Sequence, residues 1–374
     1  MSPGVLQPAL PKSMYVDPEH WVHERDSVLY TSWFCVGRID ALVLDQPRRL
    51  AVVDVAGESV LLTSDSTGAL HGAYNVCRHR GSQVVPVAPE EDLPPPCAIG
   101  ALRCPYHSWT YDLAGALIKA PHTADVSDFD AAQYGLVPVA VASWGGFCFV
   151  HLTPSVATAL DDEIADSVAG VERYPLAALA VGRRFVYDVA ANYKVLSENY
   201  NECYHCGPVH PELTRLVPAF GGGGTDIDWD GGVPHREGAW TFTMSGTSKR
   251  QPFASLDAAE RTRHKGALLH PNLWLSCSAE HVAAFTLWPQ AVDRTRVVCE
   301  LLFEPAEIAS PDFDPDDAGD LWDLVNRQDW AVCESVQRGM GSRGYQQGWF
   351  APMEDLAADI RRWLLPRLQD GENR

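Results

Sequence analysis

Two histidines and a glutamate lie close together in the stretch Ser197-Glu-Asn-Tyr-Asn-Glu-Cys-Tyr-His-Cys-Gly-Pro-Val-His210. Glu202 and His205 are three residues apart, so on a helix they share a face. Gly207-Pro208 is expected to kink or end that helix and turn His210 back towards His205. Two imidazoles and a carboxylate are the ligands of a mononuclear non-haem Fe(II) site that leaves positions open for O2.

The same stretch has two other interpretations. Cys203 and Cys206 flank His205, and with the histidines they could form a zinc site. An ordinary helix end with two histidines that bind nothing is the third interpretation. The stretch alone leaves all three open, so other parts of the chain must decide.

A second set of metal-ligand residues lies nearer the N-terminus. Cys77-Arg-His79 and Cys104-Pro-Tyr-His107 each pair one cysteine with one histidine. This mixed order predicts a Rieske [2Fe–2S] centre, in which two histidines replace two cysteines on one iron. A structural zinc site from the same residues is the alternative, although zinc fingers normally pair Cys with Cys and His with His. A one-electron cluster together with a mononuclear iron indicates reductive activation of O2.

Together the two motifs resemble the catalytic α subunit of Rieske non-haem iron oxygenases, the ring-hydroxylating oxygenase family. The resemblance covers nearly the whole chain and rests on Asn75-Val-Cys-Arg-His-Arg-Gly-Ser82, Cys104-Pro-Tyr-His-Ser-Trp-Thr-Tyr-Asp112, Asn192-Tyr-Lys194 and Glu198-Asn-Tyr-Asn-Glu-Cys-Tyr-His205. The 24 residues between His79 and Cys104 exceed the family's usual gap. We expect the Pro-rich insert at 88–97 to loop out without disturbing the ligands.

The resemblance implies a third iron ligand, a carboxylate far downstream on a C-terminal helix. Asp329 is the candidate, because Asn326-Arg-Gln-Asp329 and the following Glu334-Ser-Val-Gln-Arg-Gly339 look like the family's ligand helix. A carboxylate on a buried face needs a partner, and iron or an interhelical ion pair would provide one. We expect Asp323 and Glu334 to be solvated and Asp329 to lie on an apolar stripe formed by Trp322, Val325, Val332, Val336 and Met340.

The resemblance gives Glu202 a role other than iron ligation. It implies that Glu202 bridges His205 to a Rieske histidine, His107, of a neighbouring subunit and so couples the two centres. Family members place their own two centres far apart within one chain, so a ring-shaped homotrimer is implied. The sequence Glu-Cys-Tyr-His is similar to the subgroup that oxidises quaternary ammonium compounds: choline, carnitine, glycine betaine and stachydrine.

The function we expect is that of a terminal oxygenase component: O2-dependent monooxygenation, by hydroxylation or N-demethylation, of a small quaternary ammonium substrate. The chain has no flavin or nicotinamide motif, so NAD(P)H electrons must come through a partner, a flavin/iron–sulfur reductase with or without a ferredoxin. Trp240, Trp274 and Trp288 are candidates for cation–π faces. The alternatives are hydroxylation or demethylation of an aromatic compound or specialised metabolite and, in another class, a zinc-stabilised binding protein without redox activity.

The pattern of expected helices and strands that must position these residues predicts an α+β fold. We expect an N-terminal segment (1–35) packing on the catalytic domain, a small all-β Rieske domain (36–155) and a helix-grip catalytic domain (156–374). In the last, helices cover a central antiparallel sheet. The patterns predict a hairpin at Leu50–Thr63, a helical stretch at 155–182, strands at 184–190, 240–244, 273–278, 283–288 and 296–304, and helices at 316–340 and 353–368.

The composition indicates which kinds of binding partner and which cellular compartment to expect. The net charge of −20 argues against nucleic acid and anionic membranes, and it suits a cationic substrate or a basic redox partner. No apolar run approaches the roughly 20 residues that span a bilayer. The start Met1-Ser-Pro-Gly4 lacks the features of a signal peptide, so we expect a cytoplasmic protein. The ten cysteines then favour metal ligation or burial over disulfides.

Overall fold

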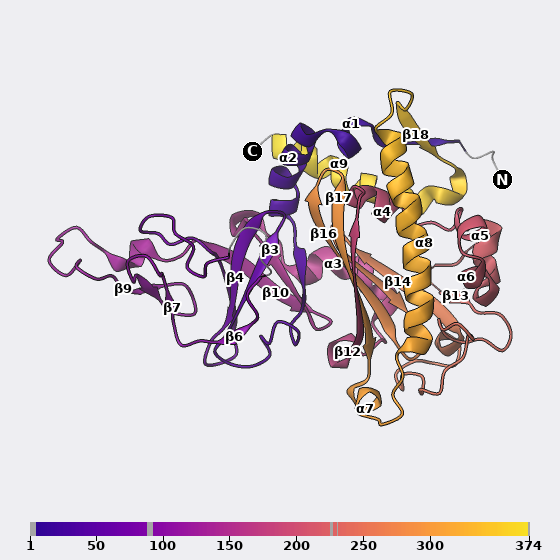
Figure 1. Ribbon diagram of the computed structural model, residues 1–374, viewed down its shortest axis with the longest axis horizontal. Helices are drawn as coiled ribbons and strands as arrows, with labels where there is room; N and C mark the ends of the chain where they lie inside the picture. Colours follow the sequence, from indigo (N-terminus) through magenta and orange to yellow (C-terminus); the bar gives the residue numbers. More distant parts are fainter. Residues whose placement is uncertain (1–4, 88–92, 225–226, 230, 373–374) are drawn as a thin grey trace. The chain divides into compact units, whose positions relative to one another are not determined.

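The computed structural model describes residues 5–87, 93–224, 227–229 and 231–372. Two compact units make up the chain: residues 29–162 form one, and the residues up to 28 together with those from 163 onwards form the other (Figure 1). The insert expected to loop out at 88–97 lies partly outside the described residues. Within these residues, no helix is both long and apolar enough to cross a membrane.

The unit of residues 29–162 consists of β-strands and short 3₁₀ turns. A seven-stranded antiparallel sheet has the order β2-β11-β10-β5-β4-β3-β6, and β7, β8 and β9 form a smaller sheet. The strands are β2 (Phe34–Arg38), β3 (Arg49–Val55), β4 (Glu58–Ser64), β5 (Leu70–Tyr74), β6 (Cys97–Ala98), β7 (Leu102–Arg103), β8 (Thr110–Tyr111), β9 (Leu117–Lys119), β10 (Pro138–Trp144) and β11 (Phe147–His151). The helix α3 (Leu160–Val168) begins at the end of this unit.

The predicted hairpin at 50–63 is present as β3 and β4. Its turn residues, Ala56 and Gly57, both have positive φ (51° and 98°), which matches a two-residue turn that follows the strand twist. Two loops of this unit carry the predicted cluster ligands. One follows β5 and the other joins β7 to β8, so that loops held by strands present both Cys/His pairs.

The second unit is built around a six-stranded antiparallel sheet of order β12-β17-β16-β15-β14-β13. Its strands are β12 (Ala180–Val189), β13 (Val233–Pro234), β14 (Arg263–Leu269), β15 (Leu273–Cys277), β16 (Val282–Ala291) and β17 (Arg294–Phe303). Its helices are α1 (Ser13–Val16), α2 (Pro18–Ser27), α4 (Tyr193–Tyr200), α5 (Cys206–Val209), α6 (Pro211–Leu216), α7 (Pro305–Ile308), α8 (Asp316–Met340) and α9 (Asp359–Glu372). A two-stranded ribbon pairs β1 (Gln7–Pro11) with β18 (Gln347–Phe350).

Several expected elements differ from those observed. The run at 240–244 is not a strand but a series of bends and a turn, and the stretch at 155–182 contains only α3 and short 3₁₀ turns before β12 begins. The C-terminal helix begins at Asp359, because a 3₁₀ stretch occupies Pro352–Ala358. Helix α8 has the predicted bounds, and the antiparallel sheet with helices against it confirms the α+β class.

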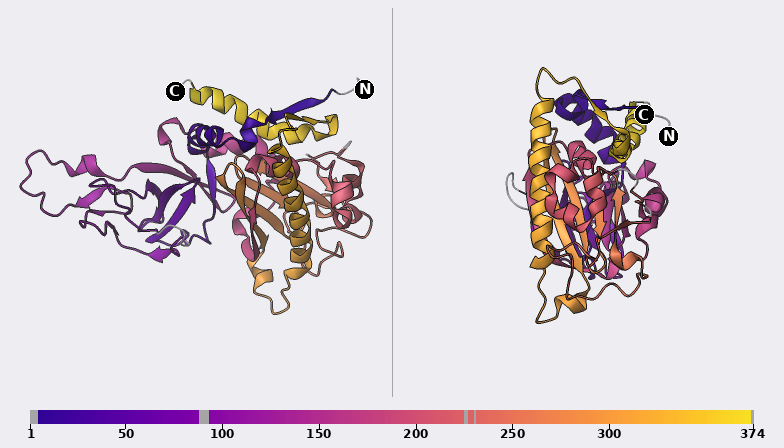
Figure 2. Two further views of the ribbon diagram at one scale, coloured as in Figure 1. Left: turned by 45° about the horizontal axis from the view of Figure 1, so that its top comes forward. Right: turned by 90° about the vertical axis from the view of Figure 1, so that its right-hand side faces the viewer.

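Helix α8 packs against β12 and α4, and Figures 1 and 2 show it running along one face of the sheet. A Cβ built at Gly319 would lie 3.4 Å from the ring of Phe185 on β12, which is ordinary contact between the helix and the strand. The predicted apolar stripe is only partly right, because Val336 is 39% exposed. The buried face includes Asn326, Cys333 and Gln337 instead, together with Trp322, Val325, Trp330 and Met340.

Candidate metal centres

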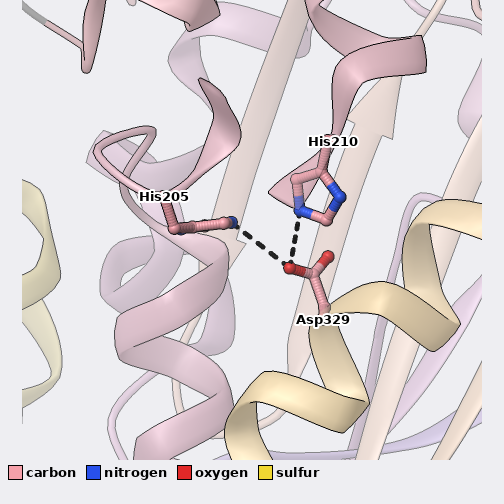
Figure 3. A group of neighbouring side chains, drawn as sticks. All are labelled: His205, His210 and Asp329. Atoms are coloured by element: carbon pink, nitrogen blue, oxygen red, sulfur yellow. Dashed lines mark hydrogen bonds and ion pairs between the residues drawn. The ribbon is translucent and has the colours of Figure 1, made fainter. Parts of the chain in front are cut away.

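His205, His210 and Asp329 converge in the catalytic unit (Figure 3). The Nε2 atom of His205 lies 3.2 Å from Oδ1 of Asp329, and Nε2 of His210 lies 2.8 Å from the same oxygen. One ligand atom from each residue lies within 4.8 Å of the other two. His210 is fully buried and the other two side chains are largely buried. Among the described residues these three therefore form a group of the size that one metal ion needs.

The local chain path differs from the expected kinked helix. Helix α4 begins after Asn192, whose side chain accepts a hydrogen bond from the Lys194 N–H, and it ends at Tyr200. Pro208 lies inside the short helix α5, where its missing N–H costs little. The chain breaks instead at His210, which precedes Pro211 and has the non-helical angles φ −121° and ψ 66°. His210 therefore turns back as expected, but its own following proline causes the turn.

Glu202 and His205 lie in a turn and do not share a helix face. The Glu202 carboxylate accepts the backbone N–H groups of Tyr204 and His205, which fixes the turn. It also accepts a hydrogen bond from Nδ1 of the His205 ring at 2.5 Å. Glu202 thus lies behind the imidazole and not among the three converging atoms, and its role outside the ligand set stays a prediction.

Gln328 supports the second imidazole in the same way, although no pattern in the sequence marks it. Its amide N–H₂ donates to the Glu212 carboxylate at 3.2 Å, so its carbonyl oxygen faces Nδ1 of His210 at 2.7 Å. Nδ1 of His210 must therefore carry the proton. Both rings then turn an unprotonated Nε2 towards Asp329, as metal-bound histidines do.

The charges of this group fit a metal cation. Two Nε2 lone pairs and a carboxylate would face one another, an arrangement that needs either a cation or an added proton between them. Burial disfavours a charged His205, but its hydrogen bonds with Asp329 and Glu202 outweigh burial and raise its pKa to about 10. Burial likewise opposes ionisation of Asp329, yet the two histidines hold its pKa below the usual value. In the absence of metal a proton would therefore take the central place, and a metal ion would displace it.

The zinc alternative that uses Cys203 and Cys206 receives no support. Both thiols are buried and lie outside the group of three converging ligand atoms. Contact with Cys203, together with burial, raises the pKa of Cys206 far above its usual value. The two thiols therefore contact each other and not the converging ligand atoms.

The four predicted cluster residues divide into a buried and an exposed pair. Cys77 and Cys104 are both 2% exposed, whereas the rings of His79 and His107 are exposed and lie 4.7 Å apart, centroid to centroid. Burial raises the pKa of the Cys104 thiol, but backbone N–H groups of its loop outweigh burial and lower it. Desolvation and the neighbouring His79 and Arg80 lower the pKa of His107. Burial raises the pKa of the Cys77 thiol, so a bound cluster would displace its proton. Buried cysteines and exposed imidazoles suit a two-iron cluster whose histidine-bound iron would face outward.

Two aromatic residues support this arrangement and were not singled out from the sequence. The Tyr111 hydroxyl lies 3.2 Å from Sγ of Cys77 and accepts the Arg78 N–H. Trp109 stacks on the His79 ring with centroids 5.0 Å apart. Hydrogen bonds to cluster sulfurs tune the reduction potential, so Tyr111 is placed to do so.

Comparison with known families agrees with both sites. The catalytic domain of the ring-hydroxylating α subunit matches residues 176–370, and the Rieske [2Fe–2S] domain matches residues 32–130. The chain belongs to the Rieske ring-hydroxylating oxygenase α-subunit family. This membership confirms the resemblance drawn from the motifs and makes the chain an oxidoreductase with a Rieske cluster and a mononuclear iron. A zinc-stabilised binding protein is thereby ruled out.

This chain is similar to three proteins whose names place them in the quaternary ammonium subgroup. It is 27% identical to the glycine betaine monooxygenase oxygenase subunit of Pseudomonas aeruginosa, over 91% of this chain and 84% of that one. It is 28% identical to the carnitine monooxygenase oxygenase subunit of Escherichia coli, over 90% of this chain and 85% of that one. A crystal structure of the quaternary ammonium Rieske monooxygenase CntA shares its fold, with a TM-score of 0.72, 24% identity and coverage of 97% and 96%.

A cavity of about 300 Å³ adjoins the three converging residues of the oxygenase. This volume suits a small molecule. The expected cation–π candidates do not line the cavity: Trp274 is buried and stacked on Tyr200, and neither Trp240 nor Trp288 reaches the wall. Other aromatic residues form much of that wall: Phe220, Trp229, Phe242, Phe285, Trp322 and Trp330.

A buried polar network holds one of these aromatic side chains. The indole N–H of Trp322 donates to Nε2 of His281 at 2.9 Å, and Nδ1 of His281 donates to the Glu280 carboxylate at 2.9 Å. Arg250 and Thr241 complete the bonding of Glu280. Trp322 also lies two helical turns before Asp329 on α8, so one helix carries both a cavity wall and a predicted iron ligand.

Proposed function

We propose that this chain is the terminal oxygenase of a Rieske system that hydroxylates or N-demethylates a small quaternary ammonium compound. His205, His210 and Asp329 would hold the mononuclear iron. Cys77, His79, Cys104 and His107 would hold the [2Fe–2S] cluster. The observation that carries the proposal is the convergence of two Nε2 atoms and one carboxylate beside an aromatic-walled cavity.

The chain's own side chains prepare the iron site. When bound, the cluster supplies electrons singly and the mononuclear iron supplies the binding and activation of O2. Glu202 and Gln328 hold the proton on each Nδ1, which keeps each Nε2 free to ligate. The carboxylates of Asp329 and Glu202 offset the double charge of Fe(II), so a cationic substrate would meet little net repulsion.

Aromatic faces and acidic groups favour a quaternary ammonium substrate. A trimethylammonium group cannot donate a conventional hydrogen bond, and aromatic faces are its usual recognition surface. The cavity wall supplies such faces close to the iron ligands. The names of the relatives point to the same class, since glycine betaine and carnitine both carry this group.

The overall reaction then balances without any further oxidant. O2 gives one oxygen atom to a C–H bond, and two electrons and two protons reduce the other atom to water. If an N-methyl group is hydroxylated, the carbinolamine loses formaldehyde and leaves a demethylated amine. The electrons would come from NAD(P)H through a separate flavin/iron–sulfur reductase.

A homotrimer in the cytoplasm is the assembly we propose. Its support is the family resemblance, in which the acidic residue before the first histidine ligand couples two subunits. Glu202 fits such a role here, because its carboxylate accepts a hydrogen bond from Nδ1 of His205, the ring nitrogen that does not face Asp329. Sedimentation of the purified protein would measure the assembly directly.

The test is a reductase-coupled screen of quaternary ammonium and aromatic compounds, following O2 uptake and product mass. We expect O2 uptake and product formation only with quaternary ammonium compounds. Iron and inorganic sulfide contents should match one cluster and one mononuclear iron per chain. Zinc without sulfide would overturn the ligand assignment, and turnover of aromatic compounds alone would overturn the substrate class.

A further inference from the structure

The hydrogen bonds behind Trp322 run in one direction and end at a carboxylate. The indole N–H of Trp322 donates to Nε2 of His281, and Nδ1 of His281 donates to Glu280, both at 2.9 Å. An indole nitrogen can only donate, so Nε2 of His281 must accept and the neutral ring holds its proton on Nδ1. His281 and Glu280 are both fully buried. A directed chain of hydrogen bonds therefore leads from the cavity wall to Glu280.

Glu280 carries a charge although it is buried. Burial opposes its ionisation, yet contacts with His281, the Thr241 hydroxyl and Arg250 outweigh burial and lower the pKa of Glu280 to about 2. Arg250 does not cancel this charge on its own, because its guanidinium lies 2.8 Å from Asp317 as well as 3.2 Å from Glu280. Two carboxylates thus share one guanidinium, and the group keeps a net negative charge.

This charge does more than anchor the indole. A neutral acceptor such as an amide carbonyl would also hold the ring of His281, whereas burying an ionised carboxylate is costly. In a low dielectric, hydrogen bonds in a chain polarise one another. A carboxylate at the end of the chain draws the indole proton towards His281, and the ring of Trp322 is left with more negative charge on its face.

Trp322 meets the cavity together with two other aromatic rings. Phe242 and Phe285 lie 5.5 Å and 5.8 Å from it, centroid to centroid, and are inclined to the indole plane by 59° and 69°. All three side chains line the cavity beside the predicted iron ligands. Rings inclined in this way can contact a roughly spherical trimethylammonium group on more than one side. Tryptophan offers the best of the aromatic faces for a cation.

We propose that Glu280, acting through His281, strengthens the cation–π interaction of Trp322 and makes this ring the binding face for the substrate's ammonium group. The inference rests on the proposed function and deepens it. Glu280 and His281 are positioning residues, since neither is among the described residues that line the cavity. Removing the charge should therefore lower the preference for a cation over a neutral molecule of the same shape.

Two pairs of probes isolate the effect of the ligand's charge. Choline and 3,3-dimethylbutan-1-ol differ in a cationic nitrogen against a neutral carbon, and glycine betaine and 3,3-dimethylbutanoate differ in the same way. Calorimetric titration of the anaerobic holoenzyme gives the ratio of affinities within each pair, here called the cation preference. We expect a cation preference of about 10-fold in at least one pair. A wild type without this preference in either pair would overturn the quaternary ammonium function and the inference with it.

The variant Glu280→Gln removes the charge, while its amide oxygen can still accept the hydrogen bond from His281. It should lower the cation preference about 3-fold to 5-fold and leave the affinities for the neutral probes unchanged. A merely structural role would weaken both members of a pair. An unchanged cation preference would overturn the inference and leave the proposed function standing, so the two failures are distinguishable.

Asp317→Asn is the matched control. It removes a carboxylate from the same Arg250 but not from the chain that leads to Trp322, so the cation preference should stay that of the wild type. A fall as large as that in Glu280→Gln would show that the charge acts through space and not through His281.

Trp322→Phe tests the last link of the chain and retains the buried carboxylate. Its cation preference should fall at least as far as that of Glu280→Gln. Adding Glu280→Gln to it should lower the preference no further, because the charge acts through the indole N–H. This variant tests the proposal even if Glu280→Gln does not fold. A cation preference that survives in Trp322→Phe, or that falls again in the double variant, would contradict the proposal.

Discussion

The carbonyl oxygen of Gln328 lies 2.7 Å from Nδ1 of His210. These two residues are 118 positions apart in the chain, and the contact joins α8 to the break between α5 and α6. Because Glu212 holds the other end of the amide, the glutamine cannot flip without losing a bond to a carboxylate. Gln328 therefore sets both the tautomer and the direction of a predicted iron ligand, one residue before the predicted ligand Asp329.

Gln328→Leu should weaken iron binding at the mononuclear site. The leucine leaves Nδ1 of His210 without an acceptor, and loss of such support typically costs about 10–100-fold in metal affinity or activity. Fe(II) affinity is measured by competition with a chelator, while the cluster absorption reports the Rieske site. Arg327→Leu at the neighbouring position is the control, because Arg327 is exposed and bonds Asp323 instead of a histidine. Equal iron affinity in the leucine variant and the wild type would show that His210 needs no such support.

Asp329→Ala should lose mononuclear iron and turnover but keep the Rieske spectrum. The alanine removes the carboxylate oxygen on which both Nε2 atoms converge. Asp323→Ala on the same helix is the matched control, because Asp323 bonds Tyr187 and Arg327 away from that point. The iron content per chain is measured together with the inorganic sulfide content, which reports the cluster. The iron in excess of the cluster then distinguishes the two variants. Normal iron content in Asp329→Ala would mean that another carboxylate is the ligand.

Most of the proposed metal ligands could be named from the sequence because they lie in short motifs. Cys77 and His79 lie within one loop, and Cys104 and His107 lie within another. The spacing inside each pair is therefore set locally and does not depend on the rest of the fold. Asp329 needed the family resemblance as well. The apolar stripe predicted for the helix of Asp329 includes Val336, which is exposed. Polar residues such as Gln337 occupy the buried face instead. Strict apolar periodicity misses a helix whose buried face carries polar contacts.

Other parts of the site depend on contacts between distant segments. The cavity residues Trp229 and Phe242 lie in irregular chain between α6 and β14, where no period marks them. Asp323 and Glu334 were expected to be solvated. Both are only partly exposed, and they bond to the Tyr187 hydroxyl and the Ala190 N–H. Such pairings follow from tertiary packing and leave no local pattern to find.

Glu202→Gln should slow electron transfer from the cluster to the mononuclear iron. The amide keeps the size of the side chain but removes the charge behind His205, a change of the kind that costs about 10–100-fold. Both metal sites should stay occupied, and an external reductant should still reduce the cluster. Single-turnover oxidation of the reduced cluster, with substrate and O2 present, measures the step. An unchanged rate removes Glu202 from the electron path, and loss of iron makes it a ligand.

Tyr111→Phe should lower the reduction potential of the cluster. The hydroxyl 3.2 Å from Sγ of Cys77 stabilises the more negative, reduced state, and one hydrogen bond contributes about 1 kcal/mol, or roughly 40 mV for one electron. Tyr106→Phe is the control, because its exposed hydroxyl contacts Arg80 and not a cysteine. Redox titration followed by electron paramagnetic resonance gives both potentials. Equal shifts in the two variants would contradict a specific bond to Cys77.

The buried pair of Tyr15 and Glu198 predicts a pH dependence of stability. The Tyr15 hydroxyl donates to the Glu198 carboxyl, and burial raises the pKa of Glu198 to about 8 although Tyr15 and Lys194 oppose the rise. The folded chain thus holds this proton more tightly than the unfolded chain, where the pKa is near its ordinary value of 4.5. Stability should therefore fall as pH rises from about 4.5 to about 8, by about 1 kcal/mol per pH unit, and then level off.

Glu198→Gln isolates this contribution, since an amide stays neutral at every pH. Thermal unfolding of the wild type and the variant between pH 6 and 9 covers the upper part of the window, where the wild type should lose stability relative to Glu198→Gln up to about pH 8. Above that pH the two curves should run parallel, because Glu198 is then ionised in both the folded and the unfolded chain. A difference that stays constant from pH 6 upwards would show that Glu198 is already ionised in the folded protein and that its pKa is not raised.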